Sequence, residues 1–144
     1  MTKVFWTCLL LSLIISRTYG QESILGQWKT VDDETGEKKS VVEIFKKDNK
    51  VFGRIVKITD PKKQDAVCDQ CDDDDPRKDQ KILGMEIIKN LEKNGDEWDD
   101  GTILDPQNGK VYKCKMWVEN DNLIVRGYIG FSWIGRSQTW LREK

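Results

Sequence analysis

The two cysteines of the segment Cys68-Asp69-Gln70-Cys71 have the type and spacing that most clearly suggest chemistry. Such a pair is compatible with thiol redox chemistry, with metal binding and with a structural disulfide. A redox pair normally opens a helix, which lowers the thiol pKa, but no helical apolar pattern flanks this one. A metal half-site needs about two further ligands. A disulfide in an oxidising compartment needs nothing more, and we expect Cys68 and Cys71 to form one.

Few other side chains are available to bind a metal. The chain contains no histidine, so only Cys114 and the aspartates could complete a site. The run from Asp72 to Asp75 lacks the alternating ligands and the turn glycine of a calcium loop, and basic residues flank it. We therefore expect a solvated loop of mixed charge, no metal and no cofactor. Cys114 then remains unpaired, as a small buried apolar residue on a strand.

The same composition disfavours catalysis. The absence of histidine removes the commonest general base, and no serine lies in a nucleophile elbow. Paired carboxylates such as Asp99 and Asp100 could act as acid and base, but turn formation explains them more simply. We expect a protein that is not an enzyme.

Large rings are concentrated in the second half of the chain, which suggests a ligand cavity, with core packing as the alternative. Arg126 and Arg136 could orient an anionic head group or could face solvent. Residues 131–134, Phe-Ser-Trp-Ile, lie between glycines in an expected turn, which suggests an exposed tip at a pocket rim, a partner contact or a membrane surface. The residues expected to bind ligand are Met85, Tyr112, Met116, Arg126, Tyr128, Phe131 and Trp133.

The chain begins with a segment that we interpret as a cleaved signal peptide, residues 1–20. Lys3 supplies the positive charge, 4–15 is an apolar run, and Thr18 and Gly20 have the spacing of a small-residue cleavage site. The run is shorter than the roughly 20 residues of a membrane-spanning helix. The remaining residues, 21–144, suffice for one domain, carry 22 basic and 25 acidic side chains, and show no sign of nucleic-acid binding. The expected location is secreted, periplasmic or extracellular.

The hydrophobic pattern has the period of two that is typical of strands. In residues 111–118, Tyr112, Cys114 and Met116 share one face and Lys113 lies on the other. Hairpin turns are expected at 48–49 and 120–122, and a long polar loop at 59–80. Eight short strands with local connections favour a closed up-and-down barrel. They are expected at 24–32, 41–46, 51–58, 82–94, 102–104 with Trp98 before it, 111–118, 123–130 and 137–142.

Several segments together support a resemblance to a known family. GQWKTVDDETGEKKSVVEIF, CDQC, ILGMEI, GTILDPQNGKVYKCKMWVE and RGYIGFSWIGRSQTW resemble the bacterial secreted domain of unknown function family 2147 across residues 25–140. The resemblance implies an all-β, eight-stranded antiparallel barrel of the lipocalin-like, calycin type in an extracytoplasmic protein.

Gly26-Gln27-Trp28 also resembles the G-x-W motif that opens the first lipocalin strand, where the tryptophan closes one end of the barrel beneath a basic side chain from the last strand. Because strand eight runs opposite to strand one, its end lies beside Trp28, and we expect Arg142 to stack there. Unlike in lipocalins, we expect no helix after the last strand, because only two residues follow Arg142. The function we expect is noncatalytic binding of a small apolar or amphipathic ligand. The alternative is an envelope interaction protein with a filled barrel that contacts a protein partner through its loops.

Overall fold

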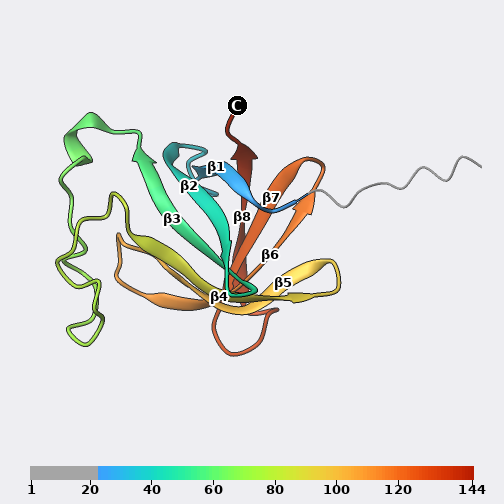
Figure 1. Ribbon diagram of the computed structural model, residues 1–144. Helices are drawn as coiled ribbons and strands as arrows, with labels where there is room; N and C mark the ends of the chain where they lie inside the picture. Colours follow the sequence, from blue (N-terminus) through green and yellow to red (C-terminus); the bar gives the residue numbers. More distant parts are fainter. Residues whose placement is uncertain (1–22) are drawn as a thin grey trace, which may run out of the picture.

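The structure is a computed structural model that describes residues 23–144 and forms one closed antiparallel barrel (Figure 1). Each strand pairs with the next along the chain, and β1 pairs with β8 to close the barrel. The expected eight-stranded up-and-down barrel is therefore confirmed. The expected signal segment, 1–20, lies outside the described residues. The strands are β1 Gly26–Val31, β2 Lys38–Lys47, β3 Lys50–Ile58, β4 Glu86–Asn94, β5 Glu97–Leu104, β6 Val111–Glu119, β7 Asn122–Tyr128 and β8 Gly135–Arg142.

Tight turns join the strands as the sequence indicates. Asp48 and Asn49, between β2 and β3, have φ values of 51° and 64°. Asn120 and Asp121, between β6 and β7, have φ values of 50° and 64°. Two central residues in the left-handed region make the turn whose twist matches that of paired strands, and Asn and Asp tolerate this conformation best.

The largest differences from the predicted strand boundaries are in the fourth and fifth strands. The fourth strand begins at Glu86 rather than 82, because Gly84, with a φ of 89°, turns the chain just before it. The fifth strand is longer than expected. It contains Asp99 and Asp100, which we had interpreted as turn residues, and Asp100 has a φ of 59° where the pairing register with β6 shifts. This bulge breaks the alternation by which the strand would have been recognised.

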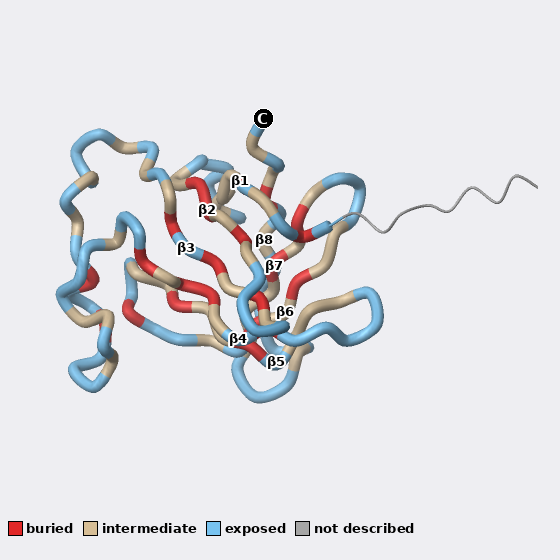
Figure 2. Tube along the Cα trace, in the orientation of Figure 1, coloured by how far each residue is buried: buried red, intermediate tan, exposed pale blue. Residues whose placement is uncertain are grey.

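The buried residues lie mainly in the strands of the barrel, and most loop residues are exposed (Figure 2). On β6 the predicted alternation holds, since Cys114 and Met116 are fully buried and Lys113 is exposed. Cys114 is a free cysteine, and burial raises its pKa to about 12. Its thiol therefore stays neutral and serves as an apolar side chain in the core.

The long loop between β3 and β4 is held by specific contacts, although it contains only a short 3₁₀ turn, Pro61–Lys63. Cys68 and Cys71 form the expected disulfide and are both buried. The guanidinium of Arg77 binds the carboxylate of Asp75 through two nitrogens, at 2.9 and 2.8 Å, and donates to the Glu86 carbonyl at 3.1 Å. The loop is thereby attached to the start of β4. It lies along the left-hand side of the barrel in Figure 1.

The disulfide packs against the turn between β5 and β6. The Cys68 sulfur lies 3.8 Å from the Pro106 carbonyl oxygen. Gly109 has a φ of 73°, and a Cβ at this position would collide with the Gln70 carbonyl. Glycine is therefore required at 109 both by its backbone conformation and by the close approach of the disulfide segment.

Within residues 23–144, the structure contains no helix that is long and apolar enough to span a membrane. The same residues contain no group of three or more cysteine, aspartate or glutamate side chains arranged to bind a metal ion.

Candidate functional site

One end of the barrel is closed by Trp28 and Arg142. Trp28 is fully buried, and its indole nitrogen donates to the Ile24 carbonyl at 2.8 Å. The guanidinium carbon of Arg142 lies 4.1 Å from the centroid of the indole ring. Arg142 also donates to the carbonyls of Ser23 and Leu25, at 3.0 and 3.4 Å. The predicted stacking is confirmed, and it ties the segment before β1 to the end of β8.

The last strand links this closed end to the opposite end of the barrel. Alternate residues of a strand share a face, so Arg136, Gln138, Trp140 and Arg142 follow one another along the inner side of β8. Arg142 lies on Trp28, Trp140 is buried in the core, and Gln138 and Arg136 come progressively nearer to the other end. The Trp140 indole nitrogen donates to the Gln138 side-chain oxygen at 2.9 Å, which fixes both side chains.

A cavity of about 630 Å³ occupies the end opposite Trp28. Its deep part is apolar and includes the buried side chains of Leu104, Val125 and Trp140. Exposed residues such as Glu34 and Asn108 also line it, so it reaches the surface among the loops at this end. The barrel is therefore not filled by its own side chains, contrary to the alternative expectation. The remaining lining residues are Thr30, Val31, Asp32, Asp33, Lys39, Ser40, Ile55, Ile87, Ile103, Asp105, Pro106, Gln107, Tyr112, Gly127, Tyr128, Ile129, Ile134, Gly135, Arg136 and Gln138.

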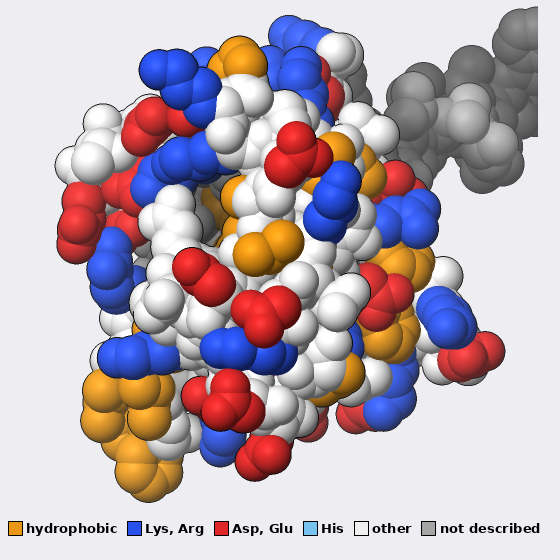
Figure 3. Space-filling view, turned by 90° about the vertical axis from the view of Figure 1, so that its left-hand side faces the viewer, with side chains coloured by type: hydrophobic (Ala, Val, Ile, Leu, Met, Phe, Trp, Pro, Cys, Tyr) orange, Lys and Arg blue, Asp and Glu red, His pale blue; other side chains and the backbone are white. Residues whose placement is uncertain are grey.

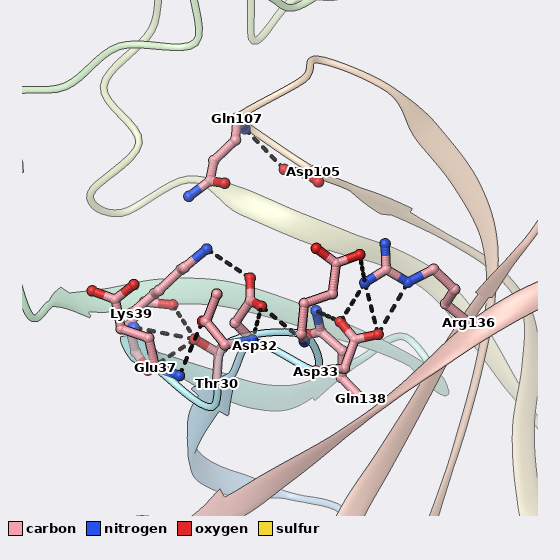
Figure 4. Close-up of polar contacts among 12 residues, drawn as sticks. Thr30, Asp32, Asp33, Glu37, Lys39, Asp105, Gln107, Arg136 and Gln138 are labelled. Atoms are coloured by element: carbon pink, nitrogen blue, oxygen red, sulfur yellow. Dashed lines mark hydrogen bonds and ion pairs between the residues drawn. The ribbon is translucent and has the colours of Figure 1, made fainter.

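Two ion pairs form one side of the cavity mouth (Figure 4). Lys39 lies 2.7 Å from the carboxylate of Asp32. Arg136, from β8, binds both carboxylate oxygens of Asp33 at 2.7 Å. The side-chain bond from Lys39 holds the pKa of Asp32 well below its usual range, and that from Arg136 lowers the pKa of Asp33. Both carboxylates are therefore charged at neutral pH.

The mouth carries more acidic than basic groups. Its lining contains four carboxylates, Asp32, Asp33, Glu34 and Asp105, but only the two cations Lys39 and Arg136. Both cations are already paired, Lys39 with Asp32 and Arg136 with Asp33. Arg136 also lies 3.3 Å from Glu34. Figure 4 shows Asp105 and Gln107 on a separate turn, across the gap from Asp32 and Lys39. The electrostatic field at the mouth therefore favours a neutral or positively charged group.

Of the seven residues that we expected to bind ligand, Tyr112 and Tyr128 line the cavity. Met116 also points inward, but it does not line the cavity. It lies two residues beyond Cys114 along β6, away from the cavity, where it is fully buried in the packed core. Met85 is buried beneath the loop that precedes β4, where it lines a separate depression with Arg77.

The other three expected ligand contacts also lie elsewhere. Arg126 lies on the outer face of β7, where it donates to the Ser132 carbonyl at 2.6 Å and to the Ser137 hydroxyl at 3.0 Å. Phe131 and Trp133 are exposed in the loop between β7 and β8 and stack on each other rather than line the cavity. The expectation that Arg126 orients a ligand head group has no support in this geometry.

Sequence reasoning missed the acidic residues of the mouth. Strand order alone carried a usable signal, because the loops after strands one, three, five and seven of an up-and-down barrel all lie at the end opposite Trp28. Asp32, Asp33 and Asp105 immediately follow strands one and five. We expected Asp32 only as the last residue of the first strand, and we connected none of the three residues with a cavity.

The geometry defines a calycin-type barrel with one closed end and one open end, and the comparisons agree with it. Residues 26–142 match the family described as "Uncharacterized protein conserved in bacteria (DUF2147)", and the chain belongs to this family. No curated protein matches the chain.

One solved structure similar to the chain is described as protein HP1028 from the human pathogen Helicobacter pylori, which belongs to the lipocalin family. The TM-score is 0.73 at 17% sequence identity, and the match covers 85% of this chain and 84% of the other. At this identity the likeness shows a common lipocalin-like fold.

Proposed function

We propose that this protein binds a small amphipathic molecule in the barrel cavity without catalysing a reaction on it. The observation that carries the proposal is the cavity of about 630 Å³ at the end opposite Trp28. Its volume is within the range of sites for small molecules, which are mostly apolar with a few polar groups. Buried Leu104, Val125 and Trp140 offer an apolar surface at depth, and polar side chains surround the mouth.

The arrangement supports a defined orientation of the ligand. The apolar part lies against the deep walls, and the head group lies at the mouth near Asp32, Asp33 and Asp105. An anionic head group would meet an excess of carboxylates, because Lys39 and Arg136 already neutralise acidic partners. The ligand class that fits is an amphiphile with a neutral or cationic head, rather than the fatty acids that a free arginine at the rim would have favoured.

The test compares three probes with the same ten-carbon chain: decylamine, decanol and decanoate. Titration calorimetry, supported by the fluorescence of the cavity residue Trp140, should show that decylamine and decanol bind and that decanoate binds at least tenfold more weakly. Failure of all three to bind would contradict the proposal. Binding of decanoate alone would contradict the proposed head-group preference.

A variant that fills the cavity controls for binding elsewhere. A Cβ at Gly127 would meet Tyr112 and Ile103, two cavity residues, at 3.5 and 3.6 Å, so Gly127→Leu directs a side chain into the cavity. We expect it to weaken decylamine binding at least tenfold. The matched control is Val111→Leu, at a residue that is 45% exposed and does not line the cavity. Urea unfolding of both variants verifies that each is folded.

We further propose that the protein functions outside the cytoplasm, in the periplasm or the extracellular space. The disulfide between Cys68 and Cys71 supports this location, because structural disulfides persist in oxidising compartments. The expected signal segment supports it independently. Intact mass measurement of the protein recovered from cell fractions is the test, and we expect an extracytoplasmic chain that begins at Gln21. A full-length chain retained in the cytoplasm would contradict this proposal.

A further inference from the structure

The loop between β7 and β8, residues 129–134, presents an apolar tip to solvent. Ile129 is 67% exposed, Phe131 60%, Trp133 72% and Ile134 57%. The rings of Phe131 and Trp133 are nearly parallel, at 6°, with centroids 4.5 Å apart, so they stack and form one apolar unit. The loop projects below the strands in Figure 1, and hydrophobic side chains gather at the lower left in Figure 3. Exposed apolar surface of this kind marks a contact site.

Several backbone groups of the tip have hydrogen-bond partners within the protein. The Ile129 amide donates to the Ile134 carbonyl at 3.2 Å, and the Ile134 amide donates to the Phe131 carbonyl at 3.0 Å. The Ser132 carbonyl accepts from Arg126 at 2.6 Å, and the Gly130 carbonyl accepts from Lys113 at 3.5 Å. Because these polar groups already have partners, moving the tip into an apolar environment costs less than it would for an open loop.

Two cations lie at the base of the tip. Lys113 and Arg126 contact its carbonyls from β6 and β7, as described above. In the part of the chain that the structure describes, neither side chain forms an ion pair with a carboxylate. They therefore remain available to anionic groups that approach the same surface. An apolar, aromatic tip with positively charged side chains beneath it is typical of an interfacial membrane anchor.

We propose that the 129–134 tip docks on a lipid bilayer. A bilayer fits better than a protein because the tip is a narrow projection of four apolar side chains, whereas a stable protein interface covers about 800 Å² on each partner. Charge complementarity points the same way, since Lys113 and Arg126 suit anionic lipid head groups. Ile129 and Ile134 belong to both the tip and the cavity lining, so docking brings the cavity mouth to the membrane surface. Resting on the proposed function, the ligand would be an amphiphile exchanged with that membrane.

Flotation with vesicles of phosphatidylcholine alone, and of phosphatidylcholine with 30% phosphatidylglycerol, tests the docking. We expect the wild-type protein to float with the anionic vesicles, and Phe131→Ser/Trp133→Ser to reduce the bound fraction at least fivefold. The control is Val67→Ser/Val111→Ser, which removes two apolar side chains that are 40% and 45% exposed outside the tip, and it should float like the wild type. Lys113→Gln should weaken binding to the anionic vesicles more than to the neutral ones.

Decylamine titration without vesicles separates this inference from the proposed function. Phe131 and Trp133 do not line the cavity, so the tip variant should bind decylamine like the wild type, which also shows that it is folded. Docking is overturned if the wild type does not float, or if the tip variant floats equally well. It is also overturned if sedimentation shows that the tip joins two copies of the chain instead. Flotation of a protein that binds no probe would overturn the cavity function and leave docking standing.

Discussion

Arg142 covers the indole ring of Trp28 at 4.1 Å, and the two residues are direct partners where β8 pairs with β1. This contact joins the first and last strands of the barrel. It also shields the buried tryptophan from solvent, and the cavity opens among exposed loops at the opposite end. One end of the barrel therefore stabilises the fold, and the opposite end gives access to the cavity.

Replacing Trp28 with alanine should lower the free energy of unfolding by about 3 to 5 kcal/mol, because it leaves a large cavity in a packed region. Replacing Arg142 with alanine should cost about 1 to 2 kcal/mol, since it removes the stacked cation and its bonds to the chain before β1. Urea unfolding followed by circular dichroism measures both. In a double-mutant cycle the two effects should be non-additive, and strict additivity would show that the stacking contributes nothing.

The disulfide should contribute to stability through its short loop. For a closed loop of about four residues, the loss of unfolded-state entropy corresponds to about 2 kcal/mol. Cys68→Ser/Cys71→Ser should lower the unfolding free energy by about that amount, and reductant should destabilise the wild type but not the variant. Thiol titration of the denatured, unreduced protein beginning at Gln21 should find one free thiol, that of Cys114. Three free thiols would contradict the disulfide.

Gly109→Ala should be more damaging than Gly95→Ala, although both glycines have positive φ, 73° and 60°. A Cβ at position 95 meets open space, so we expect only the backbone cost of about 1 to 2 kcal/mol. At position 109 the added atom also collides with the Gln70 carbonyl and must displace the disulfide segment. Chemical denaturation of the two variants gives the comparison. Equal losses would show that the loop yields without cost.

The ion pair between Asp75 and Arg77 should make the free energy of unfolding depend on pH in the acidic range. The side-chain bonds from Arg77 lower the pKa of Asp75 to about 2, from an ordinary value of 3.8. A carboxyl whose pKa is lower in the folded state stabilises the fold above its unfolded pKa and loses this contribution as the pH falls toward the folded pKa. Asp75→Asn should therefore cost about 1 kcal/mol at pH 6, and the difference from the wild type should shrink as the pH falls below 4.

Unfolding midpoints between pH 3 and pH 6 give this measurement. The control is Asp73→Asn, because the Asp73 side chain is 94% exposed and its contact with Lys78 is 3.5 Å long. We expect this variant to follow the wild type throughout. If the unfolding midpoints of the wild type and of Asp75→Asn differ by the same amount at every pH, Asp75 does not cause the pH dependence.

Much of the fold follows from the sequence because strands and turns are encoded locally. The alternation of Tyr112, Cys114 and Met116 identifies an inward face, and the Asn and Asp residues at 48–49 and 120–121 specify tight hairpins. Once the order of the strands is known, their alternating direction places Arg142 beside Trp28. The pairing of Cys68 with Cys71 is equally local, since only two residues separate them.

The candidate site was decided by the tertiary structure. Alternation shows whether a side chain points inward, but its depth along the barrel depends on the tilt and stagger of all eight strands. For this reason Tyr112 lines the cavity, whereas Met116, on the same face of the same strand, is packed in the core. Likewise, Asp33 and Arg136 are 103 residues apart, and no local pattern indicates that they share the mouth. The sequence by itself determined the barrel and its closed end; the closure of the sheet brought distant charges together and so decided what the open end can bind.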